Sequence, residues 1–275
     1  MLDSGRCTLR VDHGEGAANS LRVYDKAEAK AVTLHFADNG ILVDEGQILA
    51  AGDALGYGGA TGLAWTPHLH FEVRHARDQH PTNVLKYNFP VEDKVAPRFI
   101  SLNVYPVGEG SCVNGRKAVQ VFPLVLDQGS YTVPWGTKIN CSGKIAVGVE
   151  VFDYLNGASN RCGVYELKME VNGEQIYSHR MDEFSFGQTR YINAHIDYAE
   201  RMRSGRKIHM LRRLPGDRLS IYGRLANEGI VELANNTLTI SVDGLALGTH
   251  NYTLVVNDTA GNINTDTILV DVIAV

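Results

Sequence analysis

Two histidines separated by one residue are the feature of this chain best suited to chemistry. They lie in the segment Pro67–Val73, which reads PHLHFEV and alternates polar with apolar residues. Alternate side chains share one face of a strand, so His68, His70 and Glu72 are expected on one face, with the apolar residues on a core. Two such imidazoles can both bind a metal ion, or one can bind it while the other transfers protons. The pair alone is only moderately specific, because two surface histidines give the same pattern.

The elements that would position this strand lie upstream and read as β-structure. Alternating apolar and polar residues predict strands at 6–12, 20–24 and 31–36. Shorter apolar runs follow at 41–43, 47–50 and 53–57. Gly46 and Gly52 separate these runs and permit sharp corners. The first third of the chain is therefore predicted to be all-β, built from short strands with glycine corners.

The glycine pattern of residues 43–62, V-x2-G-Q-x4-G-D-x-L-G-Y-x-G-x-T-G, is followed by P-H-L-H-F-E-V. Together they resemble the lysostaphin-type (LytM-type) zinc endopeptidases, which cleave peptide bonds in bacterial cell-wall peptidoglycan. The resemblance covers residues 5–90, where Asn83 lies where the family usually closes its domain. It implies a partial barrel-sandwich (duplicated hybrid) domain, a Zn²⁺ cofactor, peptidoglycan peptides as partner, and a periplasmic or extracellular location in the cell envelope.

The resemblance also implies roles for three histidines. His70 matches the family's zinc ligand and His68 matches a catalytic histidine beside the metal. His35, in Thr33–Phe36, lies where the family usually reads Y-A-H-L, which contains the other catalytic histidine. In such a site zinc lowers the pKa of a bound water, and the catalytic histidines handle its proton and stabilise the oxyanion. His35 fits a core or surface position equally well, because the residues before it differ from the family pattern.

The other two family ligands come from an upstream His-x3-Asp motif, and no histidine of this chain has an aspartate four residues later. A catalytic zinc site needs about three protein ligands, and this chain keeps one. Two explanations are open. In the first, Met1 lies inside a longer gene product that supplies the ligands and a signal peptide, which would leave this chain alone inactive. Alternatively, the chain is a catalytically silent envelope binding or regulatory module. The intact His68–His70 pair favours the first explanation.

A lipoyl-like carrier domain is a third hypothesis for the same segment. Asp25–Ala27 followed by VDEGQILAAGD resembles the lysine hairpin and glycine-cornered strands of those domains. Val23 and Tyr24 replace the residues expected before the modified Lys26, and the His-x-His strand would have no role.

Composition limits the remaining functions. The chain has 275 residues and a net charge of -5, whereas a sequence-independent nucleic-acid binder is usually basic. No apolar run approaches the roughly 20 residues of a membrane span. Four cysteines (Cys7, Cys112, Cys141 and Cys162) include no C-x-x-C pair. They leave both disulfides and buried free thiols open. The basic run 201–213 fits either a solvated loop or a surface for an anionic polymer. The oligomeric state is left open.

The second part of the chain, 93–275, is predicted as an Ig-like β-sandwich that follows a peptidase domain at 1–92. Many short alternating runs with turn signals support this architecture. Asn172-Gly173 between two such runs predicts a tight hairpin, and a short helix is expected within 193–204. Residues 247–262 resemble bacterial Ig-like modules, and the whole region resembles the C-terminal part of envelope peptidases from Bacteroidetes-type bacteria.

Overall fold

The computed structural model describes most of the second half of the chain and parts of the first. The described residues are 7–12, 20–25, 30–35, 40–44, 47–50, 52–58, 71–87, 93–127, 130–134, 137, 139–232, 237–243, 251–258 and 266–274. The chain divides into two compact units. Unit 1 comprises Met1–Phe89 and Glu183–Phe186, and unit 2 comprises Pro90–Asp182 and Gly187–Val275.

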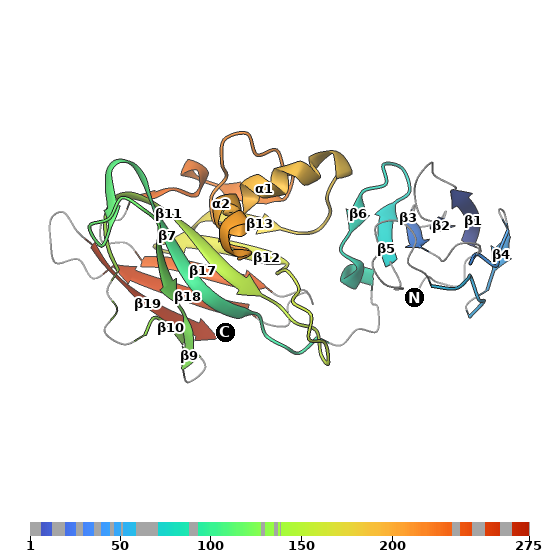
Figure 1. Cartoon of the computed structure of the whole chain (residues 1–275), viewed down its shortest axis with the longest axis horizontal. Coiled ribbons are helices and arrows are strands. Elements are labelled where there is room, and N and C mark those ends of the chain that lie inside the picture. The colour runs from blue at the N-terminus through green and yellow to red at the C-terminus, as the bar shows by residue number, and fades with distance from the viewer. Residues whose placement is uncertain are drawn as a thin grey trace. The chain divides into compact units, whose positions relative to one another are not determined.

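Unit 1 is built on an antiparallel sheet. Within its described residues the strand order is β4-β1-β2-β3-β5-β6, and the 3-10 helix η1 (Val84–Tyr87) follows β6. The strands are β1 (Cys7–Asp12), β2 (Ser20–Asp25), β3 (Lys30–His35), β4 (Ile48–Leu49), β5 (Phe71–His75) and β6 (Pro81–Thr82) (Figure 1). The strands predicted at 6–12, 20–24 and 31–36 are therefore confirmed. Gly52 has φ +96°, a left-handed conformation suited to the predicted glycine corner.

Unit 2 contains the remaining strands and, among the described residues, both α-helices of the chain. Its longest strands, β7 (Arg98–Val113) and β11 (Ile139–Phe152), pair with each other in antiparallel register. The other strands are β8 (Gln120–Pro123), β9 (Val125–Asp127), β10 (Ser130–Thr132), β12 (Glu166–Val171), β13 (Glu174–Arg180), β14 (His209–Met210), β15 (Tyr222–Leu225), β16 (Val231–Glu232), β17 (Thr237–Asp243), β18 (Asn251–Asp258) and β19 (Asp266–Ala274). The all-β class is thus confirmed.

One core joins strands that are not neighbours in the sheet. The sheet order runs β15-β13-β12-β17-β18-β19-β11-β7-β8. Nevertheless Leu167 of β12 and Tyr177 of β13 belong to the same buried cluster as Leu102 of β7 and Val147 of β11. Hydrogen-bonded strands this far apart can share a core only if the sheet folds over on itself, which fits a sandwich.

Two local predictions in unit 2 are confirmed and one is wrong in its bounds. Asn172 (φ 52°) and Gly173 (φ 80°) both have positive φ in the hairpin between β12 and β13, as a type I′ turn requires. The predicted short helix is present as α1 (Ile192–His195) and α2 (Tyr198–Ser204). The alternating run DRLSIYG (217–223) is one of those that predict a strand in this part of the chain, but the strand there begins only at Tyr222. The reason is that the Asp217 carboxylate accepts a hydrogen bond from the Leu219 amide at 2.9 Å, which holds the preceding residues in a turn.

A helical excursion, residues 187–208, leaves the sheet after β13 and returns into β14. It contains most of the 3-10 helix η2 (Phe186–Tyr191), then α1 and α2 (Figure 1). Asp197 caps α2 by accepting a hydrogen bond from the Glu200 amide at 2.9 Å. The same carboxylate accepts a hydrogen bond from the Tyr105 hydroxyl of β7 at 2.8 Å. The excursion is therefore fixed to β7 through its own helix cap.

Candidate functional site

Strand β5 is the part of the predicted peptidase site that the structure describes. It pairs with β3, and Leu34 lies opposite Phe71. These two residues are the chain neighbours of His35 and His70. His35 ends β3 opposite Ser20 of β2, and its side chain lies outside what the structure describes. His68 and His70 lie outside the described residues, so the histidine site itself stays a prediction.

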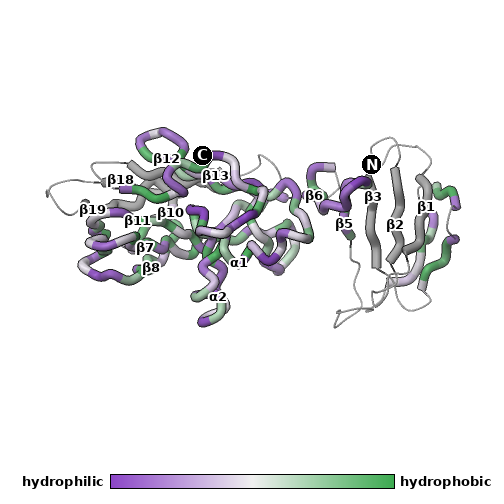
Figure 2. Tube along the Cα trace, turned by 90° about the horizontal axis from the view of Figure 1, so that it is seen from above, coloured by the Kyte–Doolittle hydropathy of each residue, from purple (hydrophilic) through white to green (hydrophobic). Residues whose placement is uncertain are grey.

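The described end of β5 shows which faces its side chains take. Val73 is buried, with 5% of its surface exposed. Glu72 and Arg74 alternate with it on the other face, where the Arg74 guanidinium lies 2.6 Å from the Glu72 carboxylate. In Figure 2 the stretch around β5 and β6 is mainly hydrophilic. The strand thus has an apolar face on the core and a polar face, as the alternation predicts.

A short distant segment completes this edge of unit 1. Glu183 forms a β-bridge with Thr82, and the Phe184 amide donates a hydrogen bond to the Pro81 carbonyl at 3.2 Å. The Glu183 carboxylate lies 2.7 Å from Nε2 of His75, and the Arg74 guanidinium lies 4.8 Å from the centre of the Phe186 ring. Backbone and side-chain contacts together hold Glu183–Phe186 against β5 and β6.

Asn83 lies at the turn that closes the described part of this sheet. Its side-chain oxygen accepts a hydrogen bond from the Leu85 amide at 3.0 Å and starts η1. The neighbouring Thr82 hydroxyl donates to the Val73 carbonyl at 3.1 Å and lies 2.9 Å from the Tyr87 hydroxyl. Asn83 therefore has a structural role at the end of the region that resembles the peptidases.

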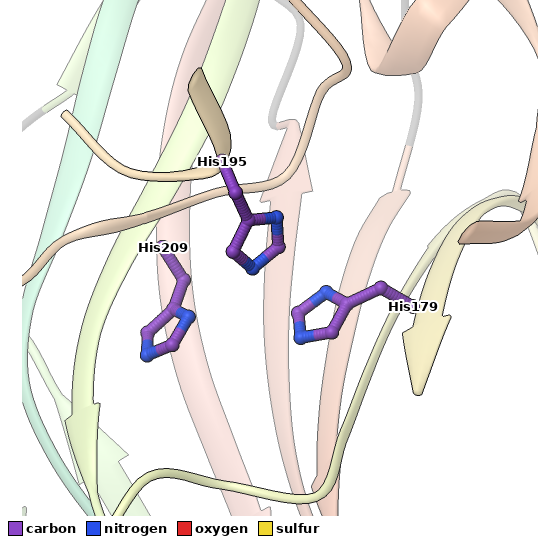
Figure 3. A group of neighbouring side chains, drawn as sticks. All are labelled: His179, His195 and His209. Atoms are coloured by element: carbon purple, nitrogen blue, oxygen red, sulfur yellow. The ribbon is translucent and has the colours of Figure 1, made fainter. Parts of the chain in front are cut away.

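Unit 2 contains a histidine cluster that spacing along the chain does not reveal. His179 of β13, His195 of α1 and His209 of β14 converge on one point, as Figure 3 shows. Each offers one ring nitrogen, and these three atoms lie within 4.8 Å of one another. It is the one group of three or more potential metal-binding side chains among the residues that the structure describes.

Burial keeps these imidazoles neutral. Loss of hydration lowers the pKa of His179 well below its usual value and that of His195 to about 3. Burial and the nearby Lys207 charge lower the pKa of His209 to about 4. Neutral imidazole is the form that binds metal ions, so the cluster is in its binding-competent protonation state at neutral pH.

Comparison with known proteins identifies the first part of the chain. Residues 4–84 match the model of peptidase family M23. No curated protein and no solved structure gives a significant match. The predicted resemblance to the LytM-type peptidases is therefore confirmed for this stretch. The match indicates a metallopeptidase-type region, since family M23 is typically metal-dependent.

The M23-matched region contains the three predicted site residues His35, His68 and His70 and excludes the histidine cluster of unit 2. Sequence reasoning missed this cluster because its members lie 14 to 30 positions apart, with no short motif. A weak signal was available: Tyr177 and His179 alternate on a predicted strand, so both face the same core.

The cysteines and the basic run have structural explanations where the structure describes them. Cys112, Cys141 and Cys162 are free thiols. Arg203, Arg206 and Arg213 of the basic run form ion pairs with Glu200, Glu150 and Glu228. These pairs neutralise part of the run, which favours the loop interpretation over a surface for an anionic polymer.

Proposed function

We propose that the M23-matched region is a zinc-dependent endopeptidase domain that hydrolyses peptide bonds of cell-wall peptidoglycan. The family match over residues 4–84 carries this proposal. The position of the histidines supports it: His68 and His70 directly precede β5, and His35 ends the strand that pairs with β5. We propose a periplasmic or extracellular location. In the part of the chain that the structure describes, no helix has the length and apolar character of a membrane span.

The metal-ligand set of this domain is incomplete in the residues at hand. Within the described part of unit 1, no three histidine, cysteine or carboxylate side chains gather around one point. In the sequence only His70 matches a family ligand. We propose that a His-x3-Asp motif upstream of Met1 supplies the others in a longer parent. Zinc bound there would act as a Lewis acid and activate water.

The chain's own residues have distinct proposed roles. His70 holds the metal. His68 and His35 accept and return a proton at an imidazole nitrogen and stabilise the negative charge on the substrate oxygen. The pairing of β3 with β5 supports this assignment, because Leu34 and Phe71, the chain neighbours of His35 and His70, lie opposite each other.

The test is hydrolysis of purified peptidoglycan by this chain and by a form extended upstream of Met1. We expect activity only in the extended form. His70→Gln should abolish it, and His68→Gln should reduce it about 10²–10⁴-fold, the usual contribution of general acid–base catalysis. His80 is a half-buried histidine between β5 and β6, so His80→Gln is the control and should retain activity.

A catalytically silent envelope-binding module is the second candidate, because the chain keeps one family ligand of three. It predicts that the extended form binds peptidoglycan but releases no peptide. That outcome, with His70→Gln leaving binding unchanged, would refute the peptidase proposal.

A further inference from the structure

The histidine cluster of unit 2 leaves three polar atoms without a protein partner. Nε2 of His179, Nε2 of His195 and Nδ1 of His209 are buried and accept or donate no hydrogen bond. His179 and His195 are both fully buried, with 0% of their surface exposed. A buried polar atom without a partner costs about 1–3 kcal/mol. Three that face one another therefore need an explanation.

The tautomer of His179 is fixed by its neighbour on β13. The Tyr177 hydroxyl donates its hydrogen to the Met210 carbonyl at 3.2 Å. It lies 3.0 Å from Nδ1 of His179 and can only accept there, because a phenol has one hydrogen. Both contacts are hydrogen bonds at once only if Nδ1 of His179 carries the proton, and Nε2 then presents a lone pair to the cluster.

The same arrangement recurs at His195. The Tyr222 hydroxyl donates to the Asp217 carboxylate, and it lies 3.1 Å from Nδ1 of His195. Nδ1 of His195 must therefore donate to the phenol oxygen, which leaves a lone pair on Nε2. Metal-binding histidines usually donate their second N–H to a carboxylate, a backbone carbonyl or a water, which fixes the ring and raises its basicity; here a phenol oxygen takes that place. Two independent tyrosines thus prepare two imidazoles as ligands.

We propose that His179, His195 and His209 form a binding site for a divalent transition metal ion of the zinc class. Imidazole nitrogens suit zinc, copper, iron and nickel, whereas calcium and magnesium require oxygen ligands. Ligands of one tetrahedral zinc lie about 3.3 Å apart, given bonds of about 2.0–2.1 Å. The three nitrogens lie within 4.8 Å of one another, so ion binding would require them to move closer together. A water would take the fourth position, as in other three-histidine sites.

A metal-free aromatic cluster is the alternative explanation. The His179 and His195 rings make an edge-to-face contact with centroids 4.5 Å apart, and the His179 and His209 rings stack at 6.0 Å. Such contacts contribute about 0.5–1.5 kcal/mol each, but they leave the three nitrogens without partners. A bound cation satisfies all three atoms at once.

The proposed ion would hold together segments that are distant along the chain. His179 lies on β13, which pairs with β12 and β15. His209 lies on β14, which pairs with β11, and His195 ends α1 in the helical excursion between them. One ion would therefore connect both halves of the folded sheet and fix the excursion to them.

The test is zinc content and thermal unfolding of the full chain, purified metal-free and titrated with Zn²⁺ alone. We expect the unfolding midpoint to rise with Zn²⁺ and to fall again with EDTA. His195→Gln and His209→Gln should each lose one equivalent of bound zinc. His80→Gln, outside the cluster, should lose none. His70→Gln should also keep the zinc of unit 2, which separates this site from the proposed peptidase site.

Tyr222→Phe tests the site without removing a ligand. Loss of the acceptor for Nδ1 of His195 should weaken zinc binding about 10–100-fold, and Co²⁺ bound by the unmodified chain should give a visible spectrum that His209→Gln changes. His209 is only half-buried, so His209→Gln can replace His195→Gln in these measurements if the latter does not fold. Equal zinc content and equal midpoint shifts in the unmodified chain and His209→Gln would overturn the proposal, as would no zinc uptake by the unmodified chain.

Discussion

His179, His195 and His209 each have a pKa that burial lowers below that of an exposed imidazole, with His195 at about 3 and His209 at about 4. Above pH 6.5 both the folded and the unfolded states are neutral at these positions. As the pH falls from about 6.5 toward 4, the unfolded chain takes up protons that the folded protein resists. The free energy of unfolding should therefore decrease in this window.

Urea unfolding of the EDTA-treated chain at several pH values measures this loss. Each histidine that the folded protein keeps unprotonated changes the free energy of unfolding by at most about 1.4 kcal/mol per pH unit. His195→Gln should reduce the slope by up to that amount, whereas His80→Gln serves as the control. A stability that does not change between pH 7 and pH 4.5 would contradict the expected burial of neutral imidazoles.

The contrast between the two histidine groups shows what a sequence can reveal. His68 and His70 belong to one predicted strand, so their spacing alone predicts that they share a face. His179, His195 and His209 come from three elements, and only the tertiary packing of β13, α1 and β14 brings them near one another. Long-range register is not encoded in any local pattern, so this cluster could not be predicted.

Strand β11 is covered on both faces, and its second cover is the helical excursion. Residues 145–152 are all buried, although only alternate residues face the core shared with β12. A Cβ on Gly148 would lie 2.9 Å from Ile208, which shows how closely the excursion approaches. Glu150, on this second face, binds Arg206 at 2.6 Å and is 6% exposed. Arg206 also donates to the Ser101 hydroxyl of β7 at 2.7 Å.

Arg206→Met should therefore destabilise unit 2 by about 3–5 kcal/mol, because it leaves the Glu150 carboxylate buried without its cation. Arg203 offers a matched control: its side chain is 74% exposed and pairs with Glu200 on the same excursion. Arg203→Met should cost less than about 1 kcal/mol. Urea unfolding compares the two variants. Equal losses would show that burial of the pair does not matter here.

The sequence predicted most strands of both units but not this cover. Alternation identifies a strand with one apolar face, and the run 144–153 alternates in that way. The second face of β11 carries Gly148 and Glu150, and the ion pair of Glu150 with Arg206 helps to bury it. Local patterns place glycine and glutamate at the surface. The strand at 217–223 is shorter than its alternation predicts for a related reason. The Asp217 side chain accepts a hydrogen bond from the Leu219 backbone amide, which holds this stretch in a turn.

The chain passes between its two units three times, since Glu183–Phe186 belongs to unit 1 while its flanks belong to unit 2. The fragment 1–92 therefore lacks part of its own unit. The missing contacts are a β-bridge, a backbone hydrogen bond and the stacking of Arg74 on Phe186. The His75–Glu183 pair is about half exposed and contributes little.

Together these contacts should stabilise unit 1 by about 1–2 kcal/mol, from about 1 kcal/mol for a net hydrogen bond and about 0.5–1 for a cation–π contact. The unfolding midpoint of fragment 1–92 should rise by several degrees with a millimolar peptide of residues 181–188. A peptide with Phe186→Ala is the control and should have a smaller effect. No response to either peptide would show that Glu183–Phe186 is dispensable.

The weak contact of Glu183–Phe186 with β5 and β6 forms because both partners belong to the same chain. Tethered segments meet at an effective concentration on the order of millimolar, far above that of separate molecules in solution. A single proteolytic cut between Tyr87 and Asp93 would remove this advantage, and dilution would then separate Glu183–Phe186 from β5 and β6. One broken peptide bond would thus turn an intramolecular contact into one whose occupancy depends on protein concentration.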